Sequence, residues 1–120
     1  MAKITPTKVG QFVTLWKRIG NGPIQPYAME DLIELFIIAA AKDNKFGLFI
    51  FPKSVLYKHG IIATNSQGGK LALRVYPSWD ITTNKQAQKT QAWQLEHFLE
   101  VPDNEPINQH RAQTLYNLKG

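Results

Sequence analysis

Two residues beside a predicted β-hairpin carry groups that could act on a phosphodiester. The stretch GLFIFPKSV, residues 47–55, has the pattern of a buried strand that ends by delivering Lys53, and Asp31 opens the apolar segment before it. In an antiparallel hairpin the start of the first strand lies beside the end of the second, so Asp31 and Lys53 are predicted neighbours. A carboxylate that holds a divalent cation, with a lysine that stabilises the attacked phosphate, is an arrangement of metal-dependent nucleases.

The same stretch lacks the second acid that such a site needs. Phe51, two residues before Lys53, stands where that nuclease class places a carboxylate. Magnesium takes several oxygen ligands, and one carboxylate is too few. Glu30 and Glu34 are the other nearby acids that could supply a ligand. The sequence therefore favours a degenerate site, in which Asp31 and Lys53 form a surface ion pair or no contact at all.

A second group of residues combines positive charges with an aromatic ring. On the predicted strand KLALRVYP, Arg74 and Tyr76 share one face, which offers a charge for a phosphate and a ring for stacking. Lys85 and Lys89 lie four residues apart near the N-terminus of a predicted helix, where a phosphate would be favoured, although a solvated helix face has the same spacing. The predicted nucleic-acid contacts are Lys17, Arg18, Lys53, Arg74, Tyr76, Lys85 and Lys89, with Trp79 as an alternative ring to Tyr76.

Other catalytic and cofactor chemistries have no support in the sequence. The chain contains no cysteine, which excludes disulfides, thiol chemistry and cysteine-ligated zinc. There is no glycine-rich phosphate loop, and no serine has the context of an activated nucleophile. The histidines have no metal-ligand spacing with one another or with acids: His59, His97 and His110. No catalytic residue, cofactor or metal is therefore predicted.

Positive charge is concentrated in the first three quarters of the chain. The net charge is +5, and residues 1–90 hold 12 Lys and Arg against 5 Asp and Glu, whereas residues 91–120 hold 2 against 4. This asymmetry indicates a polyanionic partner, or simply a soluble basic surface. No apolar run approaches the roughly 18 residues of a membrane span. The N-terminal residues lack the apolar stretch of a signal peptide, so the cytoplasm is the expected compartment.

The strands that must position these residues are predicted from apolar patterning. Residues 8–18 have apolar side chains on both faces, as a central strand does. Residues 31–41 and 48–52, joined by a polar turn with a glycine, form a predicted β-hairpin. Residues 70–77 alternate, with Leu71, Leu73 and Val75 inward and Lys70, Ala72, Arg74 and Tyr76 outward.

Helices are predicted after the hairpin and near the C-terminus. A short helix begins at Pro52 and ends at His59, because Pro is preformed for a helix start and Gly60 stops it. A long helix spans about 85–100, with a capping box of Thr83 and Gln86. Its apolar stripe comprises Ala92, Leu95, Phe98 and Leu99. With a short helix or packed tail at 110–118, the layout is α/β, a mixed sheet with flanking helices.

Five stretches, taken in order, closely resemble the MepB-like family of small bacterial proteins. They are KITPTKVGQFVTLWKR, NGPIQPY, FIFPKSVLYKHGI, RVYPSWD and NKQAQKTQAWQLEHF, and they cover nearly the whole chain. The resemblance implies a variant of the restriction-endonuclease-like fold. It also implies nucleic-acid binding without an established catalytic activity, in proteins typically encoded beside a multidrug efflux transporter and its repressor.

The family pattern also places a helix and a strand ahead of the KITPTK stretch. We therefore expect a single domain, residues 1–120, that lacks the family's N-terminal helix and first strand. The sheet edge left uncovered would invite pairing with another copy, so a homodimer through that edge is expected.

The functional hypothesis is non-catalytic binding of nucleic acid, DNA rather than RNA, with no membrane partner. Two alternatives stay open. The first is a metal-dependent nuclease that uses Asp31, Lys53 and a further acid. The second is an adaptor that binds a protein partner and is linked to multidrug efflux.

Overall fold

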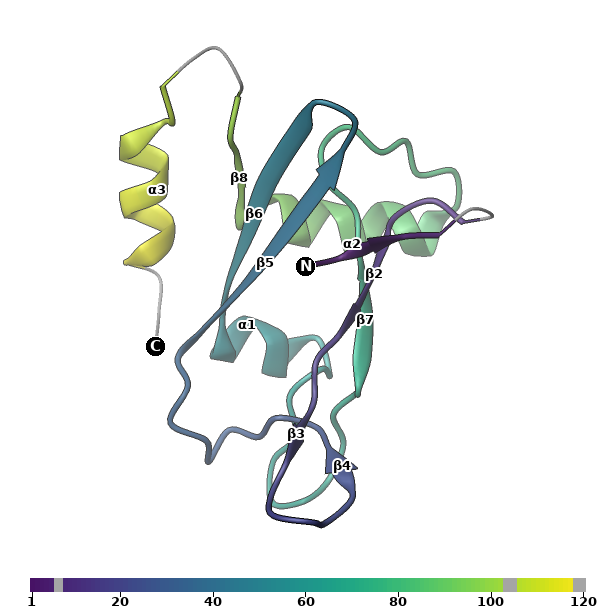
Figure 1. The fold of residues 1–120 in the computed structure, drawn as a ribbon, viewed down its shortest axis with the longest axis vertical. Coiled ribbons are helices and arrows are strands. Elements are labelled where there is room, and N and C mark those ends of the chain that lie inside the picture. Colours follow the sequence, from purple (N-terminus) through teal and green to yellow (C-terminus); the bar gives the residue numbers. More distant parts are fainter. Residues whose placement is uncertain (6–7, 103–105, 118–120) are drawn as a thin grey trace.

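The computed structural model describes residues 1–5, 8–102 and 106–117 of the chain. Figure 1 shows the order and arrangement of the elements. The strands are β1 Lys3–Ile4, β2 Gln11–Thr14, β3 Lys17–Arg18, β4 Ile24–Gln25, β5 Leu35–Lys42, β6 Lys45–Pro52, β7 Ala72–Val75 and β8 Phe98–Glu100. The helices are α1 Lys53–Lys58, α2 Lys85–Leu95 and α3 Gln109–Tyr116. Among the described residues, no helix is long and apolar enough to cross a membrane.

The hairpin β5–β6 is the longest element of the fold. Its two eight-residue strands pair antiparallel from Leu35 opposite Pro52 to Lys42 opposite Lys45. The two-residue turn between them has Asp43 at a φ of 56°, the left-handed conformation that tight hairpin turns require. The predicted hairpin is therefore confirmed.

A second sheet contains β1, β2 and β7, with β2 in the middle. The predicted central strand 8–18 is split, because pairing with β7 ends at Thr14 and the chain then pairs Lys17 and Arg18 with β4. Val13 is buried and Phe12 is exposed, so only one face of β2 packs on the core. The prediction of a central strand is confirmed, since β2 lies between β1 and β7, although β2 is shorter than residues 8–18.

Helix α1 agrees with the sequence prediction, whereas α2 is shorter than predicted. Pro52 caps α1 and His59 ends it. Helix α2 stops at Leu95, and residues 98–100 instead form β8 against β6, which buries Phe98 and Leu99. Strand pairing and burial override local helix propensity there. The N-terminal cap is Asn84, whose side chain accepts a hydrogen bond from the N–H of Ala87, rather than Thr83.

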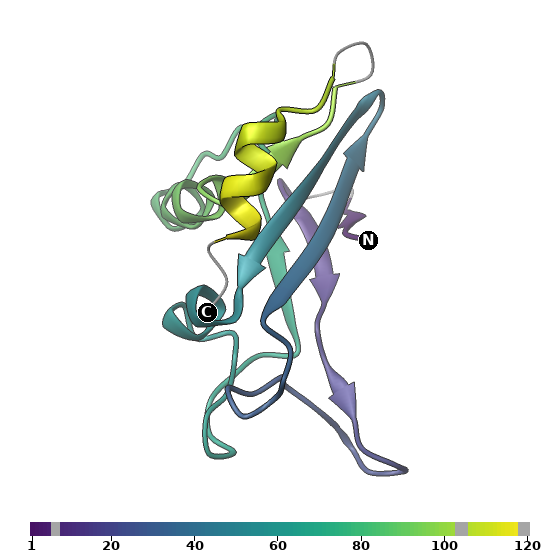
Figure 2. The same ribbon diagram turned by 90° about the vertical axis from the view of Figure 1, so that its left-hand side faces the viewer.

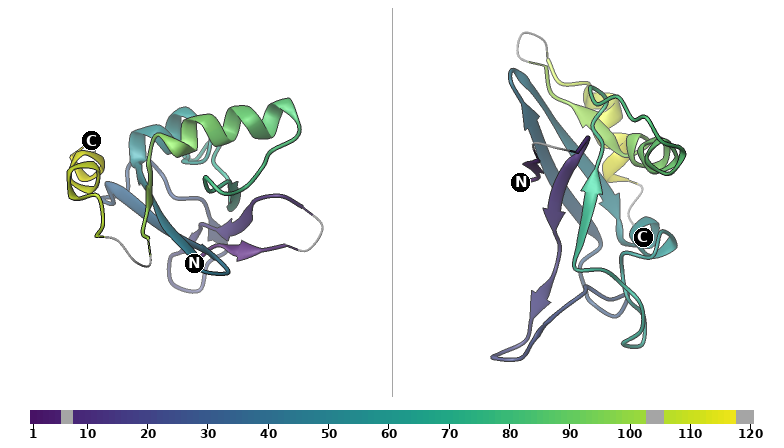
Figure 3. Two further views of the ribbon diagram at one scale, coloured as in Figure 1. Left: turned by 90° about the horizontal axis from the view of Figure 1, so that it is seen from above. Right: turned by 90° about the vertical axis from the view of Figure 1, so that its right-hand side faces the viewer.

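The three helices lie on one side of the strands, and the N-terminus lies on the other (Figure 2). Seen from above, α2 runs across the strands, and α3 stands at the end of the molecule farthest from the start of α2 (Figure 3). Helix α3 confirms the predicted C-terminal helix up to Tyr116, while Leu118 lies outside the described residues. It packs Leu115 against Ile50 and Leu99. The larger core cluster includes Phe49, Phe51, Leu56, Val75 and Phe98.

The α/β class is confirmed, with a different sheet arrangement from the one expected. The described strands form three separate sheets, and every strand pair in them is antiparallel. The parallel pairing that would make a sheet mixed occurs as the isolated bridge of Ala28 with Ala63. The restriction-endonuclease-like part of the expectation stays a prediction.

Candidate functional site

The structure brings Lys53 and Asp31 together, but through the main chain. The Lys53 ammonium donates hydrogen bonds to the carbonyl oxygens of Met29 at 2.9 Å and of Asp31 at 2.6 Å. Its backbone N–H donates to the carbonyl of Glu34 at 2.9 Å. Lys53 therefore fastens the segment before β5 to the start of α1, and no ion pair forms with the Asp31 carboxylate.

The partner of the Asp31 carboxylate is Lys17. The Lys17 ammonium donates to both carboxylate oxygens, at 2.6 and 2.8 Å, and the N–H of Ala28 donates to one of them at 2.8 Å. The hydrogen bond from Lys17 is the largest of the effects that hold the pKa of Asp31 below its usual value. Lys17 is thus committed to an internal ion pair, which counts against its predicted role as a phosphate contact.

The other acids considered as metal ligands point elsewhere. The Glu30 carboxylate accepts hydrogen bonds from the N–H of Asn65 at 2.9 Å and the Thr64 hydroxyl at 3.3 Å, and chiefly the Asn65 bond lowers its pKa. Glu34 is exposed, and Phe51 is fully buried in the core. No group of three acid or histidine side chains in the described parts of the chain could hold a metal ion.

The predicted phosphate contacts do not form one surface. Arg18 is exposed on β3, with its guanidinium 5.8 Å from the centre of the Trp16 ring. In Figures 1 and 2, β3 and β4 lie at the lower tip of the molecule, well below α2. The group at that end, Lys17, Arg18 and Lys53, is therefore separate from the group around β7 and α2, which contains Arg74, Tyr76, Lys85 and Lys89.

A cleft of about 770 Å³ lies between β7 and α2, and we call it the β7–α2 cleft. Three of the side chains that line it are cationic: Lys8 from the β1–β2 loop, Lys70 and Arg74. None of its lining residues is an aspartate or a glutamate. Thr82, Thr83 and Asn84, which lead into α2, add polar groups at one end. The cleft therefore presents positive charge without local compensation.

Arg74 and Tyr76 form the β7 wall of this cleft, as the alternating pattern predicted. The Arg74 Nη1 atom donates to the Thr5 hydroxyl at 2.9 Å and to the Gly10 carbonyl at 3.1 Å, which fixes the guanidinium. Its Nη2 and Nε atoms have no partner among the described residues, so they remain available to an anion. The Tyr76 ring lies over Gly10, where a Cβ atom would approach it to 2.7 Å.

Helix α2 is held against β7 by two glutamines, and of its predicted apolar stripe Leu95 packs against the core from within the helix. Gln94 is fully buried, and its side chain accepts from the Tyr76 N–H and donates to the Arg74 carbonyl, each at 2.9 Å. Gln91 donates to the carbonyls of Pro77 and Asp80 at 3.0 and 2.9 Å. Ala92, expected in the stripe, is exposed.

Lys85 and Lys89 both lie on exposed positions of α2. Both Lys89 and Glu96 line a second cleft of about 550 Å³, which we call the α2 cleft. Four residues line both clefts, so the two are adjacent: His59, Gln86, Thr90 and Trp93. The His59 and Trp93 rings stack with centroids 3.9 Å apart and planes at 6°.

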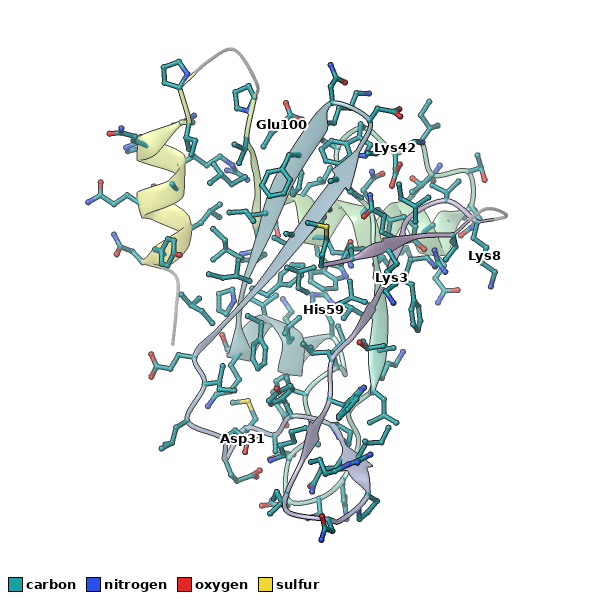
Figure 4. The ribbon with its side chains drawn as sticks, in the orientation of Figure 1. Lys3, Lys8, Asp31, Lys42, His59 and Glu100 are labelled. Carbon is teal, nitrogen blue, oxygen red and sulfur yellow. The ribbon has the colours of Figure 1, made fainter. Side chains whose placement is uncertain are left out.

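Sequence reasoning missed Lys8, Lys70 and His59. Lys70 was predicted on the same strand face as Arg74, and that signal could have identified it. Lys8 was placed in a strand, whereas the structure puts it in the β1–β2 loop (Figure 4). No local pattern pairs His59 with Trp93, because their contact is tertiary. Trp79, considered as a stacking ring, packs edge-on against the core residue Phe98, with the two ring centroids 5.7 Å apart.

Comparisons with known proteins identify relatives of this chain. A family model described as MepB-like matches residues 1–100. A solved structure described as the crystal structure of MepB is similar, with a TM-score of 0.78 and 41% sequence identity. The match covers 87% of this chain and 68% of that one. No curated protein matches the chain.

Proposed function

This chain belongs to the MepB-like family, and we propose that it binds nucleic acid, DNA rather than RNA, through the β7–α2 cleft without cutting it. The observation that carries the proposal is the lining of the cleft. Lys8, Lys70 and Arg74 line it, and no carboxylate does. Phosphate oxygens would satisfy the unpartnered donors of Arg74, and the electrostatic attraction would supply most of the affinity.

The distribution of charge along the chain supports the same reading. Some of the cations that make up the basic excess of residues 1–90 are engaged within the fold. Lys17 is paired with the Asp31 carboxylate, and the Lys53 ammonium donates to main-chain oxygens. Lys8, Lys70 and Arg74 keep their charge uncompensated by acids in the lining of the β7–α2 cleft, while Glu96 lines the adjacent α2 cleft beside Lys89. Binding without cleavage is proposed because the acids near Lys53 are engaged in other contacts or exposed, and Phe51 faces the core.

The proposal is tested by measuring the salt dependence of DNA binding. Fluorescence anisotropy would follow a labelled oligonucleotide across a range of salt concentrations for the wild type and for Lys8→Ala and Lys70→Ala. Each lost phosphate contact should reduce the slope of log K against log salt by about 0.9 on duplex DNA or about 0.7 on a single strand. Lys45→Ala is the matched control, since Lys45 is exposed and lines neither cleft.

Three outcomes would contradict parts of the proposal. Absence of DNA binding at low salt, or slopes that Lys8→Ala and Lys70→Ala leave unchanged, would reject the cleft as the binding site. Tighter binding to RNA of the same sequence would reject the preference for DNA. Cleavage of plasmid DNA with magnesium or manganese, abolished in Asp31→Ala, would replace binding with the nuclease alternative.

A further inference from the structure

The stacked rings of His59 and Trp93 form a flat shelf shared by the β7–α2 cleft and the α2 cleft. His59 ends α1, and Trp93 lies in the last turns of α2, so two separate elements build the shelf. The near-parallel geometry, at 6° between the planes, gives one continuous aromatic unit rather than an edge contact. Figure 4 labels His59 near the middle of the view and Lys8 at its margin.

The shelf has a rigid base and an accessible top. Phe51 is fully buried, and the centroid of its ring lies 5.4 Å from that of the Trp93 ring, which anchors the indole to the core. His59 lies on Trp93 and is half-buried, and both rings line the two clefts. Burial is the main cause that lowers the pKa of His59, which favours the neutral imidazole and a flat uncharged surface.

The size of the clefts selects the form of nucleic acid that could reach this shelf. Volumes of about 770 and 550 Å³ lie in the range of small-molecule pockets, roughly 300–1,000 Å³. Proteins read duplex DNA with a convex helix or ribbon placed in a groove. Here the β7–α2 cleft is a half-open hollow and the α2 cleft beside it is shallow, and bases stacked inside a duplex would not lie flat on the shelf that the two share. Unpaired bases can stack on aromatic side chains, as they do in single-strand binders.

We propose that the His59–Trp93 shelf is a base-stacking subsite and that the two clefts take an unpaired stretch of nucleic acid. One base stacks on the shelf, and its flanking phosphates contact Lys70 or Arg74 on one side and Lys89 on the other. This inference rests on the proposed function and adds the form of the ligand and the residue that contacts the base. His59 is the new binding residue that it assigns.

The test combines a change in the protein with a change in the ligand. The protein variants are His59→Ala, which removes the top of the shelf, and His59→Phe, which restores a flat ring. The probes are a 12-nucleotide oligothymidine, a duplex of the same length and a 12-unit abasic strand with the same phosphates. Affinities are measured at one salt concentration, and salt slopes for the oligothymidine. His110→Ala is the matched control, because His110 is exposed on α3 and lines neither cleft.

His59→Ala should weaken oligothymidine binding by roughly 5- to 150-fold, the effect of losing one stacked base. His59→Phe should restore the affinity, and His110→Ala should leave it unchanged. The salt slope should not change, since no phosphate contact is lost. The wild type should bind the abasic strand more weakly than oligothymidine by a similar factor, and His59→Ala should not distinguish the two strands as strongly.

The failures are distinguishable. If oligothymidine and duplex both fail to bind, the proposed function is wrong. If the duplex binds as tightly as the single strand, or His59→Ala binds oligothymidine like the wild type, the proposed function stands and the base-stacking subsite is rejected. Loss of affinity in His59→Ala that His59→Phe does not restore would also reject stacking as the cause.

Discussion

The ammonium group of Lys53 organises the segment that precedes β5. It holds the carbonyls of Met29 and Asp31, while the Asp31 carboxylate is held by Lys17 and Ala28. These contacts join three stretches of chain that are distant in sequence. The sequence placed Asp31 and Lys53 close together correctly, although β5 begins at Leu35 rather than at Asp31, and the Lys53 hydrogen bonds complete the contact outside the hairpin. It could not show that main-chain oxygens, rather than a carboxylate or a phosphate, accept the hydrogen bonds of the Lys53 ammonium.

Lys53→Met should therefore lower stability more than it lowers nucleic-acid affinity. Hydrogen bonds from a charged group contribute about 1.5–3 kcal/mol each, and part-exposed ones lie at the lower end, so we expect a loss of about 2 kcal/mol. Urea unfolding measures this change, with Lys45→Met as the exposed control. An unchanged unfolding free energy together with a reduced salt slope would instead assign Lys53 to a phosphate.

At the scale of elements, the hairpin β5–β6 and strand β7 were predicted more accurately than helix α2. The hairpin β5–β6 and the face of β7 follow from alternation and turn chemistry, which are local signals. Helix α2 was extended to Glu100 because Phe98 and Leu99 fit a helical stripe, whereas both are buried in β8. Gln94 holds α2 against β7 through its side-chain hydrogen bonds, and a search for apolar periodicity cannot detect a buried amide.

Gln94→Leu should destabilise the packing of α2 on β7. Leucine fills a similar space but leaves the Tyr76 N–H and the Arg74 carbonyl without the partner they now have. Each unsatisfied buried group costs about 1–3 kcal/mol, so we expect a loss of roughly 2–4 kcal/mol in urea unfolding.

Faster hydrogen exchange at the Tyr76 amide would localise that loss to the edge of β7. Gln88→Leu is the control on the same helix, because Gln88 is exposed. Equal unfolding free energies for the two leucine variants would contradict the role given to Gln94.

At the scale of the whole molecule, tertiary contacts determine which cations are paired and which share a surface, and the sequence does not show this. The seven predicted contact residues divide between two ends of the fold, and one of them, Lys17, is internally paired. The net charge and its asymmetry indicated a polyanionic partner but not which cations share a surface. Lys8 and Lys70 acquire their shared cleft from the placement of the β1–β2 loop and of β7.

Acid should destabilise the whole molecule through His97. This side chain is buried, and burial is the main cause that lowers its pKa below the ordinary value of 6.5, while Glu96 acts in the opposite sense and Arg111 and His59 in the same sense. The unfolded chain then binds a proton more readily than the folded one. Stability is therefore complete above pH 6.5 and declines as the pH falls below it.

Urea unfolding between pH 7.5 and pH 5 measures this decline. His97→Phe, which keeps a ring beside Phe51, should make the pH dependence less steep, and His110→Phe on the exposed face of α3 should not. The same slope in His97→Phe and the wild type would show that other groups cause the acid sensitivity.

The side chain of Gln94, which forms hydrogen bonds with the edge of β7, also matters while the chain is being synthesised. Until Gln94 has been synthesised, the outer edge of β7 is an open template for pairing with strands of other chains. Gln94 follows its partners Tyr76 and Arg74 by only 18 and 20 residues. At synthesis rates of roughly 5–20 residues per second, the gap is filled in about 1–4 seconds. The edge is therefore without its Gln94 partner only briefly during synthesis.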